Sequence, residues 1–112
     1  MPVYERLGDV RSRAITMGKI ADILQARGDL DEALRIRREE QLPVYERLGD
    51  VRSLLVARAN TAITLLRMHK SAEASDLLFS ALDSAESMRI PEAETIRSII
   101  AKRNFTRSVK ET

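Results

Sequence analysis

The chain has 112 residues, enough for one domain that buries roughly 60 to 70% of the surface of its unfolded form. Hydrophobic residues make up 44% and charged residues 32%, which excludes a chain disordered throughout, and the scarcity of aromatic, glycine and proline residues favours helices over strands. The net charge of +2 is small and basic residues alternate with acidic ones, so composition indicates no nucleic-acid-binding face, and no stretch approaches the ~20 apolar residues that span a bilayer.

The chain begins with a sequence that it later repeats. Residues 2–12, Pro-Val-Tyr-Glu-Arg-Leu-Gly-Asp-Val-Arg-Ser, recur unchanged at residues 43–53, 41 positions further on. Eleven consecutive identities indicate a recent duplication. Beyond this segment the two copies share few residues, namely Ala21/Ala62, Leu24/Leu65, Glu32/Glu73 and Ala33/Ala74. Most of these are small or apolar, so we expect the second copy to keep the packing positions and to form a terminal, capping repeat.

The first predicted helix covers about residues 9–27. Its apolar residues are spaced by three or four positions, which places them on one helical face. This inner face consists of Val10, Ala14, Met17, Ala21 and Leu24, and we expect Ile20 and Ile23 to form a second buried edge. Gly28 suits the left-handed conformation that ends a helix, and Asp29 or Asp31 can cap the next one.

The second predicted helix begins near Leu30 and ends at Gly49-Asp50. Its inner positions are Leu30, Ala33, Leu34, Arg37, Gln41, Tyr45 and Leu48. Pro43 lacks the N–H that would bond to the carbonyl of Glu39, which costs roughly 3 kcal/mol in an undistorted helix. Because the apolar positions continue beyond Pro43, we expect a kink there, and the alternative is a break near Leu42.

A second helix pair and a closing helix follow. The third helix has the inner face Val51, Leu55, Ala62 and Leu65, a turn lies near residues 69–71, and the fourth helix presents Leu77, Leu78, Ala81, Leu82, Ala85 and Met88. The closing helix, about residues 91–105, starts at Pro91 with Glu92 and Glu94 in its first turn and has the inner face Ala93, Ile96, Ile99, Ile100 and Phe105. The predicted fold is therefore all-α, one domain over residues 1–112 with antiparallel helix-pair repeats at about 9–48 and 50–88 and a C-terminal capping helix.

Residues 17–33, Met-Gly-Lys-Ile-Ala-Asp-Ile-Leu-Gln-Ala-Arg-Gly-Asp-Leu-Asp-Glu-Ala, resemble the core of tetratricopeptide repeats. The likeness is greatest to the long-period repeats of kinesin light chains and bacterial arrays. In that family a small residue, a Gly and an Ala mark the crossing of two helices, matching Ala21, Gly28 and Ala33 here, whereas the second copy has His69 in place of the Gly. The resemblance covers residues 9 to 88 and implies an α-α superhelix (solenoid), although the family's Trp and most of its other aromatic residues are absent.

The resemblance also implies that the first helix of each pair lines a concave groove for a peptide or partner helix. The residues expected there are Ile15, Gly18, Lys19, Asp22, Gln25, Ala26, Val56, Ala59, Asn60, Ile63, Leu66 and Arg67. Family members that hold a peptide's terminal carboxylate use Lys, Arg and Asn, so Lys19, Asn60 and Arg67 are candidates for such a clamp. The alternative is that Lys19 and Arg67 are solvated and that Asn60 bonds the neighbouring helix.

Two other functions remain open at this stage. The chain starts within what should be the tail of a preceding second helix, so the outer face of the first helix lacks a neighbour and could associate with a second copy as a homo-oligomer. Excision from a longer array would expose the same face. The alternative of another class is a helical nucleic-acid-associated regulatory domain, for which the basic C-terminal residues Lys102, Arg103, Arg107 and Lys110 are the candidates.

We expect neither catalysis nor a cofactor or metal site. His69 is the only histidine and lies at a predicted turn, and the absence of cysteine removes thiolate ligands and thiol nucleophiles. The chain also has no Gly-rich phosphate loop. The sequence therefore predicts a cytoplasmic protein-protein interaction or self-assembly scaffold with a protein or peptide partner and no membrane association.

Overall fold

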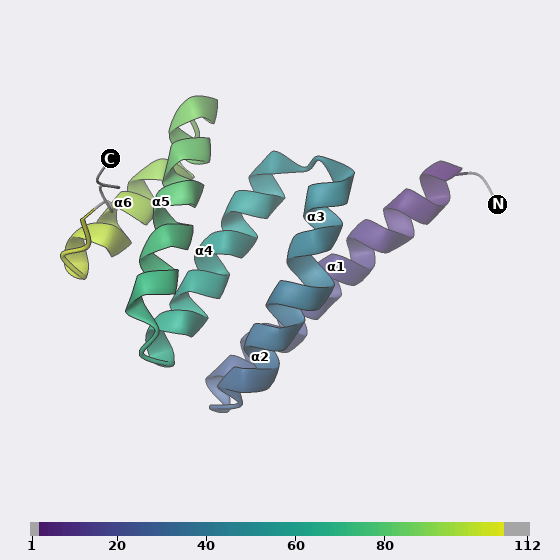
Figure 1. Cartoon of the computed structure of the whole chain (residues 1–112). Helices are drawn as coiled ribbons and strands as arrows, with labels where there is room; N and C mark the ends of the chain where they lie inside the picture. The colour runs from purple at the N-terminus through teal and green to yellow at the C-terminus, as the bar shows by residue number, and fades with distance from the viewer. Residues whose placement is uncertain (1–2, 107–112) are drawn as a thin grey trace, which may run out of the picture.

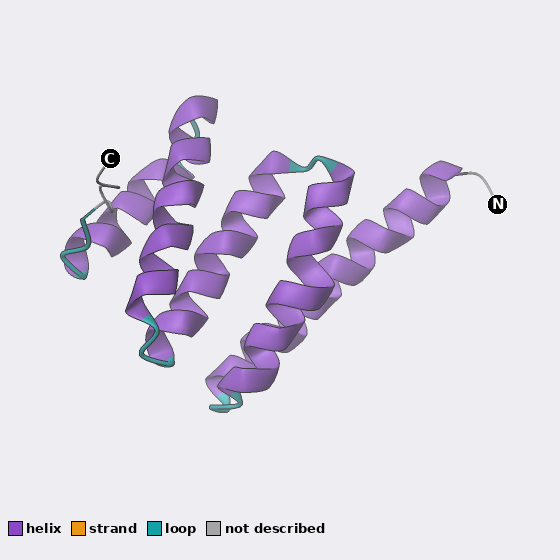
Figure 2. Cartoon of the chain, viewed as in Figure 1, coloured by secondary structure: helices purple, strands orange, loops and turns teal. Residues whose placement is uncertain are grey.

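The computed structural model describes residues 3–106, and every regular element in that range is a helix (Figures 1 and 2). Helix α1 is followed by a long helical segment in which α2, a π-helical turn η1 and α3 run on without a break. Helices α4, α5 and α6 come next, each after a short turn, and successive helices lie side by side (Figure 1). The bounds are Val3–Ala26 for α1, Leu30–Ile36 for α2, Arg37–Gln41 for η1, Leu42–Leu48 for α3, Val51–Arg67 for α4, Ser71–Met88 for α5 and Glu92–Lys102 for α6. The all-α class is thus confirmed.

Left-handed residues follow five of these helices, namely Gly28 after α1, Gly49 after α3, His69 after α4, Arg89 after α5 and Asn104 after α6. Gly28 and Gly49 have φ angles of 87° and 65°, as expected after a helix, and His69 adopts a φ of 62° at the end of α4 without the freedom of glycine. Asp50 caps α4, since its carboxylate accepts a hydrogen bond from the Ser53 N–H at 3.2 Å. Asp29 occupies the corresponding position before α2 but its side chain makes no capping bond, so the predicted cap is not found there.

The long second helix passes through Pro43 as predicted, and a π-helical turn makes this possible. Proline cannot donate to the carbonyl four residues earlier, so the regular α-helical ladder cannot continue through it. In η1 the N–H of Leu42 bonds to the carbonyl of Arg37, five residues earlier. The wider turn absorbs the missing bond just before the proline, and the helix resumes as α3.

Helix α1 begins at Val3 rather than near residue 9, so the predicted start was wrong. Its backbone is helical through Gly8 and Asp9, whereas Gly49 and Asp50, in the same eleven-residue sequence, form a turn. A Cβ atom would meet nothing within 4 Å at Gly8 or at Gly49, so the space at the glycine itself does not distinguish the two copies. A turn gives up helical hydrogen bonds, and without packing to compensate the helix simply continues; its first turns run away from α3 (Figure 1).

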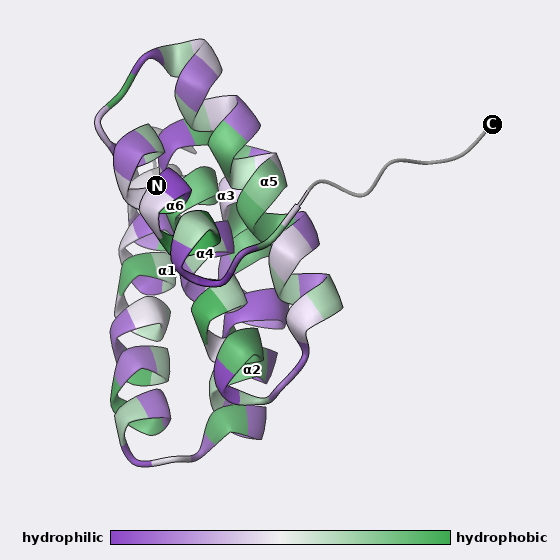
Figure 3. Cartoon of the chain, turned by 90° about the vertical axis from the view of Figure 1, so that its left-hand side faces the viewer, coloured by the Kyte–Doolittle hydropathy of each residue, from purple (hydrophilic) through white to green (hydrophobic). Residues whose placement is uncertain are grey.

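The main hydrophobic core lies among α4, α5 and α6. Its fully buried residues include Leu55, Leu65 and Leu78, and Leu34 reaches it from α2. Smaller clusters join α1 to the second helix, where Ala21 and Ala33 are fully buried and let the two backbones approach closely. Figure 3 shows hydrophobic and hydrophilic residues alternating along the longer helices, as expected for helices with one buried face. None of the described helices has both the length and the apolar character needed to cross a membrane.

Four residues predicted to be buried are exposed. Ile20 and Ile23, the expected second buried edge of the first helix, are 39% and 58% exposed because no helix covers that side of α1. Val51 and Met88 are also exposed, since they are the first residue of α4 and the last of α5 and extend past the packed region. Periodicity identified the apolar face correctly but could not tell whether a neighbour covers it.

Candidate functional site

The residues predicted to line the groove do not form one surface. Ile15 and Lys19 lie exposed on α1, and neither of them lines the two pockets described below. Leu66 was predicted to face the groove but is only 8% exposed and belongs to the main core. It follows Leu65 in α4, and both pack inward because α4 is covered on a wider arc than α1.

Three other predicted groove residues belong to a hydrogen-bond network around Arg37. The Arg37 side chain is 2% exposed; its Nη2 donates to Asp22 Oδ1 at 2.7 Å and to Gln25 Oε1 at 3.3 Å, and its Nε donates to Thr64 Oγ1 at 3.0 Å. Arg67 Nη1 donates to the backbone oxygen of Gln25 at 2.7 Å. A buried guanidinium is stable only when it is paired and hydrogen-bonded, so this network fixes α1, η1 and α4 relative to one another.

The three residues of the proposed carboxylate clamp therefore lie in different surroundings. Arg67 already bonds to the backbone of α1, Lys19 is exposed on α1, and Asn60 lines the hollows described next. The clamp stays a prediction, tested by asking whether Lys19→Ala with Arg67→Ala changes the binding of any identified peptide.

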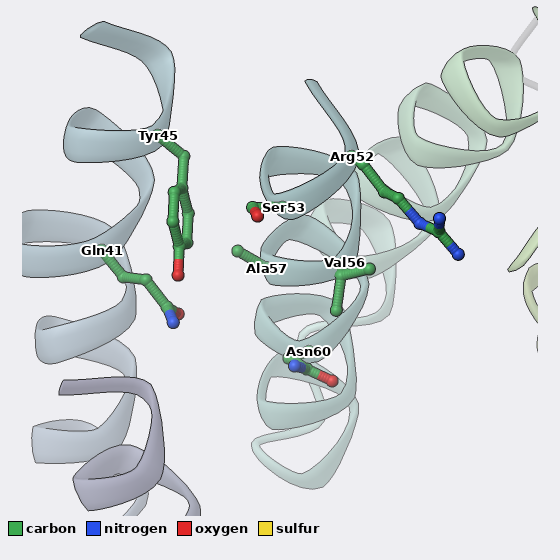
Figure 4. Close-up of a pocket in the computed structure, with 7 residues that line it drawn as sticks. All are labelled: Gln41, Tyr45, Arg52, Ser53, Val56, Ala57 and Asn60. Carbon is green, nitrogen blue, oxygen red and sulfur yellow. The ribbon is translucent and has the colours of Figure 1, made fainter. Parts of the chain in front are cut away.

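A polar pocket of about 260 Å³ opens between the second helix and α4 (Figure 4). Its lining residues are Gln41, Tyr45, Arg52, Ser53, Val56, Ala57 and Asn60. Figure 4 shows the ends of the Gln41 and Tyr45 side chains close together, across from Ser53, Ala57 and Asn60 on α4. The pocket therefore combines an amide, two hydroxyls and a second amide with apolar walls, and the only charged group in its lining is Arg52.

Gln41 is the most informative residue of the polar pocket. It is 7% exposed, and its Nε2 donates to the backbone oxygen of Ala14 at 3.3 Å. Because that carbonyl can only accept, the atom of the Gln41 amide that faces it must be the nitrogen. Gln41 Oε1 is buried and has no hydrogen-bond partner. An unpaired buried acceptor is costly, and such an exception in a native fold calls for an explanation.

Gly18 provides the space for Gln41. A Cβ atom on Gly18 would lie 2.3 Å from Gln41 Nε2. Sequence reasoning placed Gly18 in the groove, whereas it is buried beneath the Gln41 side chain. Any larger residue at this position would displace the end of Gln41, so the glycine in α1 determines where the unpaired oxygen lies.

An apolar pocket of about 150 Å³ lies on the other side of α4, against α6. Its lining residues are Leu55, Val56, Ala59, Asn60, Ile63, Glu92, Thr95, Ile96 and Ile99. Glu92 Oε2 accepts two hydrogen bonds from Arg52, at 2.7 and 3.0 Å, whereas Glu92 Oε1 is buried without a partner. The hydrogen bonds from Arg52, followed by one from the backbone N–H of Glu92 itself, lower the pKa of the Glu92 carboxyl, so this group is ionised at neutral pH and can only accept.

The two pockets share Val56 and Asn60, so together they form a groove along α4, which we call the α4 groove. The ion pair of Arg52 with Glu92 joins the two sides, and each side contains one buried oxygen that lacks a donor. Of the predicted groove residues, Val56, Ala59, Asn60 and Ile63 belong to it. Sequence reasoning missed Gln41 and Glu92, although an amide at an inner position of the second helix was a usable signal.

Other predicted sites receive no geometric definition. Within residues 3–106, no three His, Asp or Glu side chains come together so as to hold a metal ion. Lys102 and Arg103 are exposed at the end of α6, and the remaining basic candidates, Arg107 and Lys110, lie outside the described residues.

No protein-family model, curated protein or solved structure matches this chain.

Proposed function

We propose that the chain is a cytoplasmic protein-protein interaction module whose α4 groove binds a segment of a partner protein. The observation that carries this proposal is the pair of adjoining pockets that share Val56 and Asn60. Binding sites combine apolar walls with a few convergent polar groups, and this groove has both.

We also propose a tetratricopeptide-like arrangement as the basis of this groove: two antiparallel helix pairs, α1 with α2–α3 and α4 with α5, capped by α6. The repeated eleven-residue segment supports it, as do the fully buried Ala21, Ala33, Ala62 and Ala74 at equivalent positions of the two pairs. Small residues at these positions allow close helix packing. In such an arrangement the first helices, α1, α4 and α6, follow one another along one side, where the partner would lie.

The proposal is tested by selecting binders from a random peptide library displayed on phage. Asn60→Arg places a long charged side chain in the wall that both pockets share, and we expect it to weaken the selected peptides by at least about tenfold. Ser87→Arg adds the same charge at an exposed position of α5 and should leave binding unchanged. If no peptide is selected, or if Asn60→Arg binds as well as the unchanged chain, the groove is not the interaction site.

Self-association is a second candidate, supported by the exposed row Ile15, Ile20 and Ile23 on α1. The equivalent residues of the second copy, 41 positions later, are Thr61 and Thr64, and both are fully buried in α4. The first copy therefore exposes isoleucines at positions that are covered in the second. Light scattering after size-exclusion chromatography, over a hundredfold range of concentration, gives the mass directly. A dimer that Ile20→Glu with Ile23→Glu converts to a monomer would support this candidate, and a monomer at every concentration would exclude it.

A further inference from the structure

The uncovered side of α1 forms one continuous stripe, and its equivalent in α4 is buried. The stripe, which we call the α1 stripe, consists of Asp9, Thr16, Ile20, Ile23 and Arg27. Their spacing of three, four or seven positions places all five on one line along the helix, and all five are exposed. The residues 41 positions later in α4 include Ala57, Thr61 and Thr64, which are at most 2% exposed.

In the second copy this side of the helix is covered by the preceding helix pair, since α2, η1 and α3 all contact α4. Ala57 packs with Tyr45 of α3. Thr64 Oγ1 accepts a hydrogen bond from Arg37 Nε of η1 at 3.0 Å. The α1 residue in place of Thr64 is Ile23, which cannot accept, so a covering helix with the same arginine would leave its guanidinium unpaired. The α1 stripe therefore fits an apolar partner better than another pair of this kind.

We propose that the α1 stripe binds the α1 stripe of a second copy, with the two helices antiparallel about a twofold axis. This inference rests on the self-association candidate above and specifies its interface. Asp9 and Arg27 carry opposite charges at the two ends of the stripe, and only an antiparallel pair brings Asp9 of each copy to Arg27 of the other. The register that pairs them also sets Ile20 opposite Thr16 of the second copy and places the two Ile20 side chains about one turn apart.

The other end of the molecule offers no face that matches the α1 stripe. There α6 exposes Glu94, Thr95, Arg97 and Ser98. Arg97 is also paired with Glu86 at 3.0 Å. A head-to-tail contact would bury these polar groups against isoleucines, which is costly. Two α1 stripes instead present the same apolar centre and complementary charges to each other, and a contact of this kind closes at two chains.

The dimer should be weak because the contact is short. From Asp9 to Arg27 the stripe extends about 27 Å along the helix, at 1.5 Å per residue. A single helix pair of this length buries less than a standard protein interface, so we expect a dissociation constant on the order of micromolar or higher. Ile20→Glu with Ile23→Glu puts four carboxylates at the centre and should weaken the dimer by at least about a hundredfold.

Charge reversal tests the pairing of the two ends. Asp9→Arg sets two arginines together at each end of the dimer, and Arg27→Glu sets two carboxylates together there. Each variant should weaken the dimer by about tenfold at low salt and by less at high salt. The double variant restores opposite charges and should dimerise as the unchanged chain does. Val51→Glu alters an exposed aliphatic residue outside the stripe and should leave the mass unchanged. Light scattering gives the mass, and circular dichroism shows that each variant is folded.

Introduced cysteines test the direction of the helices, because the chain has none of its own. An equal mixture of Asp9→Cys and Arg27→Cys, mildly oxidised, should give the mixed disulfide, identified by mass spectrometry. Either variant alone should give little disulfide, because in an antiparallel pair its two thiols lie about 27 Å apart along the axis. A parallel pair would give the opposite pattern.

The possible failures are distinguishable. A chain that stays monomeric at every concentration overturns both this interface and the self-association candidate, and leaves peptide binding by the α4 groove as a separate question answered by Asn60→Arg. A dimer that survives Ile20→Glu with Ile23→Glu overturns this interface alone. So does a dimer that both charge reversals leave unchanged, or one in which Asp9→Cys readily forms a disulfide with itself.

Discussion

One eleven-residue sequence folds in two ways within this chain. In residues 43–53 the helix stops at Gly49, with φ of 65°, and α4 starts after Asp50, whereas in the first copy the backbone stays helical through Gly8 and Asp9. Since the local sequence is the same, its surroundings must decide. Tyr45 in the second copy is buried in a cluster with Ala14 and Ala57. The Gly-Asp pair permits a turn, and packing on both sides of it makes the turn the more stable choice.

The strongest test of this comparison removes the packing. Tyr45→Ala should lower the free energy of unfolding by about 3 kcal/mol, because a ring that is 5% exposed leaves a cavity between α1 and α4. Urea denaturation followed by circular dichroism measures the change. The matched variant is Tyr4→Ala, the same residue in the same local sequence of the first copy. If both variants lose equal stability, packing against α1 and α4 is not what distinguishes the two copies.

The two glycines should respond to the same change with opposite signs. Gly49→Ala forces alanine into a left-handed conformation and should cost about 1 to 2 kcal/mol. Gly8→Ala places alanine in a regular helix with open space around its methyl group, so it should gain up to about 1 kcal/mol. Thermal and urea unfolding of the two variants are compared under one set of conditions. A loss of stability in Gly8→Ala would mean that the first copy also turns in solution.

The same contrast explains what could be predicted from the sequence. Gly28 and Gly49 were identified as helix ends because glycine suits a left-handed residue there, and the continuation through Pro43 followed from the apolar positions beyond it. The uninterrupted helix at Gly8 was not predicted, because the two copies have the same sequence there. That sequence does not show that the first copy lacks the packing of the second. The predicted burial of Ile20 and Ile23 was wrong for the same reason. The spacing of apolar residues indicates which face of a helix they occupy, but not whether another helix covers that face.

The candidate site was predicted less well than the fold. Asn60 and Ile63 were placed in a groove by resemblance and do line the α4 groove. Arg37 and Gln41 were assigned to the inner face of the second helix, but their partners come from α1 and α4, across a tertiary interface that local spacing does not define. The position of the unpaired Gln41 oxygen depends on Gly18, 23 residues earlier in the chain.

The helix cap formed by Asp50, in the second copy, should stabilise the fold by an amount that depends on pH. Asp50→Ala should cost about 1 kcal/mol at pH 7 because the Ser53 N–H loses its acceptor. The hydrogen bonds from Ser53, helped by Arg11, lower the pKa of Asp50 in the folded state. Its stabilisation is therefore present above the ordinary carboxyl pKa of about 4 and is lost as the pH falls through the lower, folded-state value.

The measurement for Asp50 is the difference in unfolding free energy between the unchanged chain and Asp50→Ala from pH 7 to pH 2.5. That difference should shrink as the solution becomes more acidic. Asp50→Asn keeps a capping oxygen without the charge, so its stability relative to Asp50→Ala should vary much less with pH. A difference that grows on acidification would contradict the lowered pKa.

The smallest expected effect concerns the turns at the other end of the two helix pairs. His69 stands 41 positions after Gly28, and both adopt positive φ angles, 62° and 87°. His69→Gly relieves a left-handed conformation that costs a residue with a Cβ about 1 to 2 kcal/mol, while the added freedom of glycine in the unfolded chain offsets part of the gain. A net gain of about 0.5 kcal/mol should follow, seen as a small rise in Tm, and the reciprocal Gly28→His should lower Tm by a similar or larger amount. If His69→Gly instead destabilises the chain, the imidazole makes contacts that outweigh its backbone strain, and the second helix pair would then have its own reason to depart from the glycine of the first.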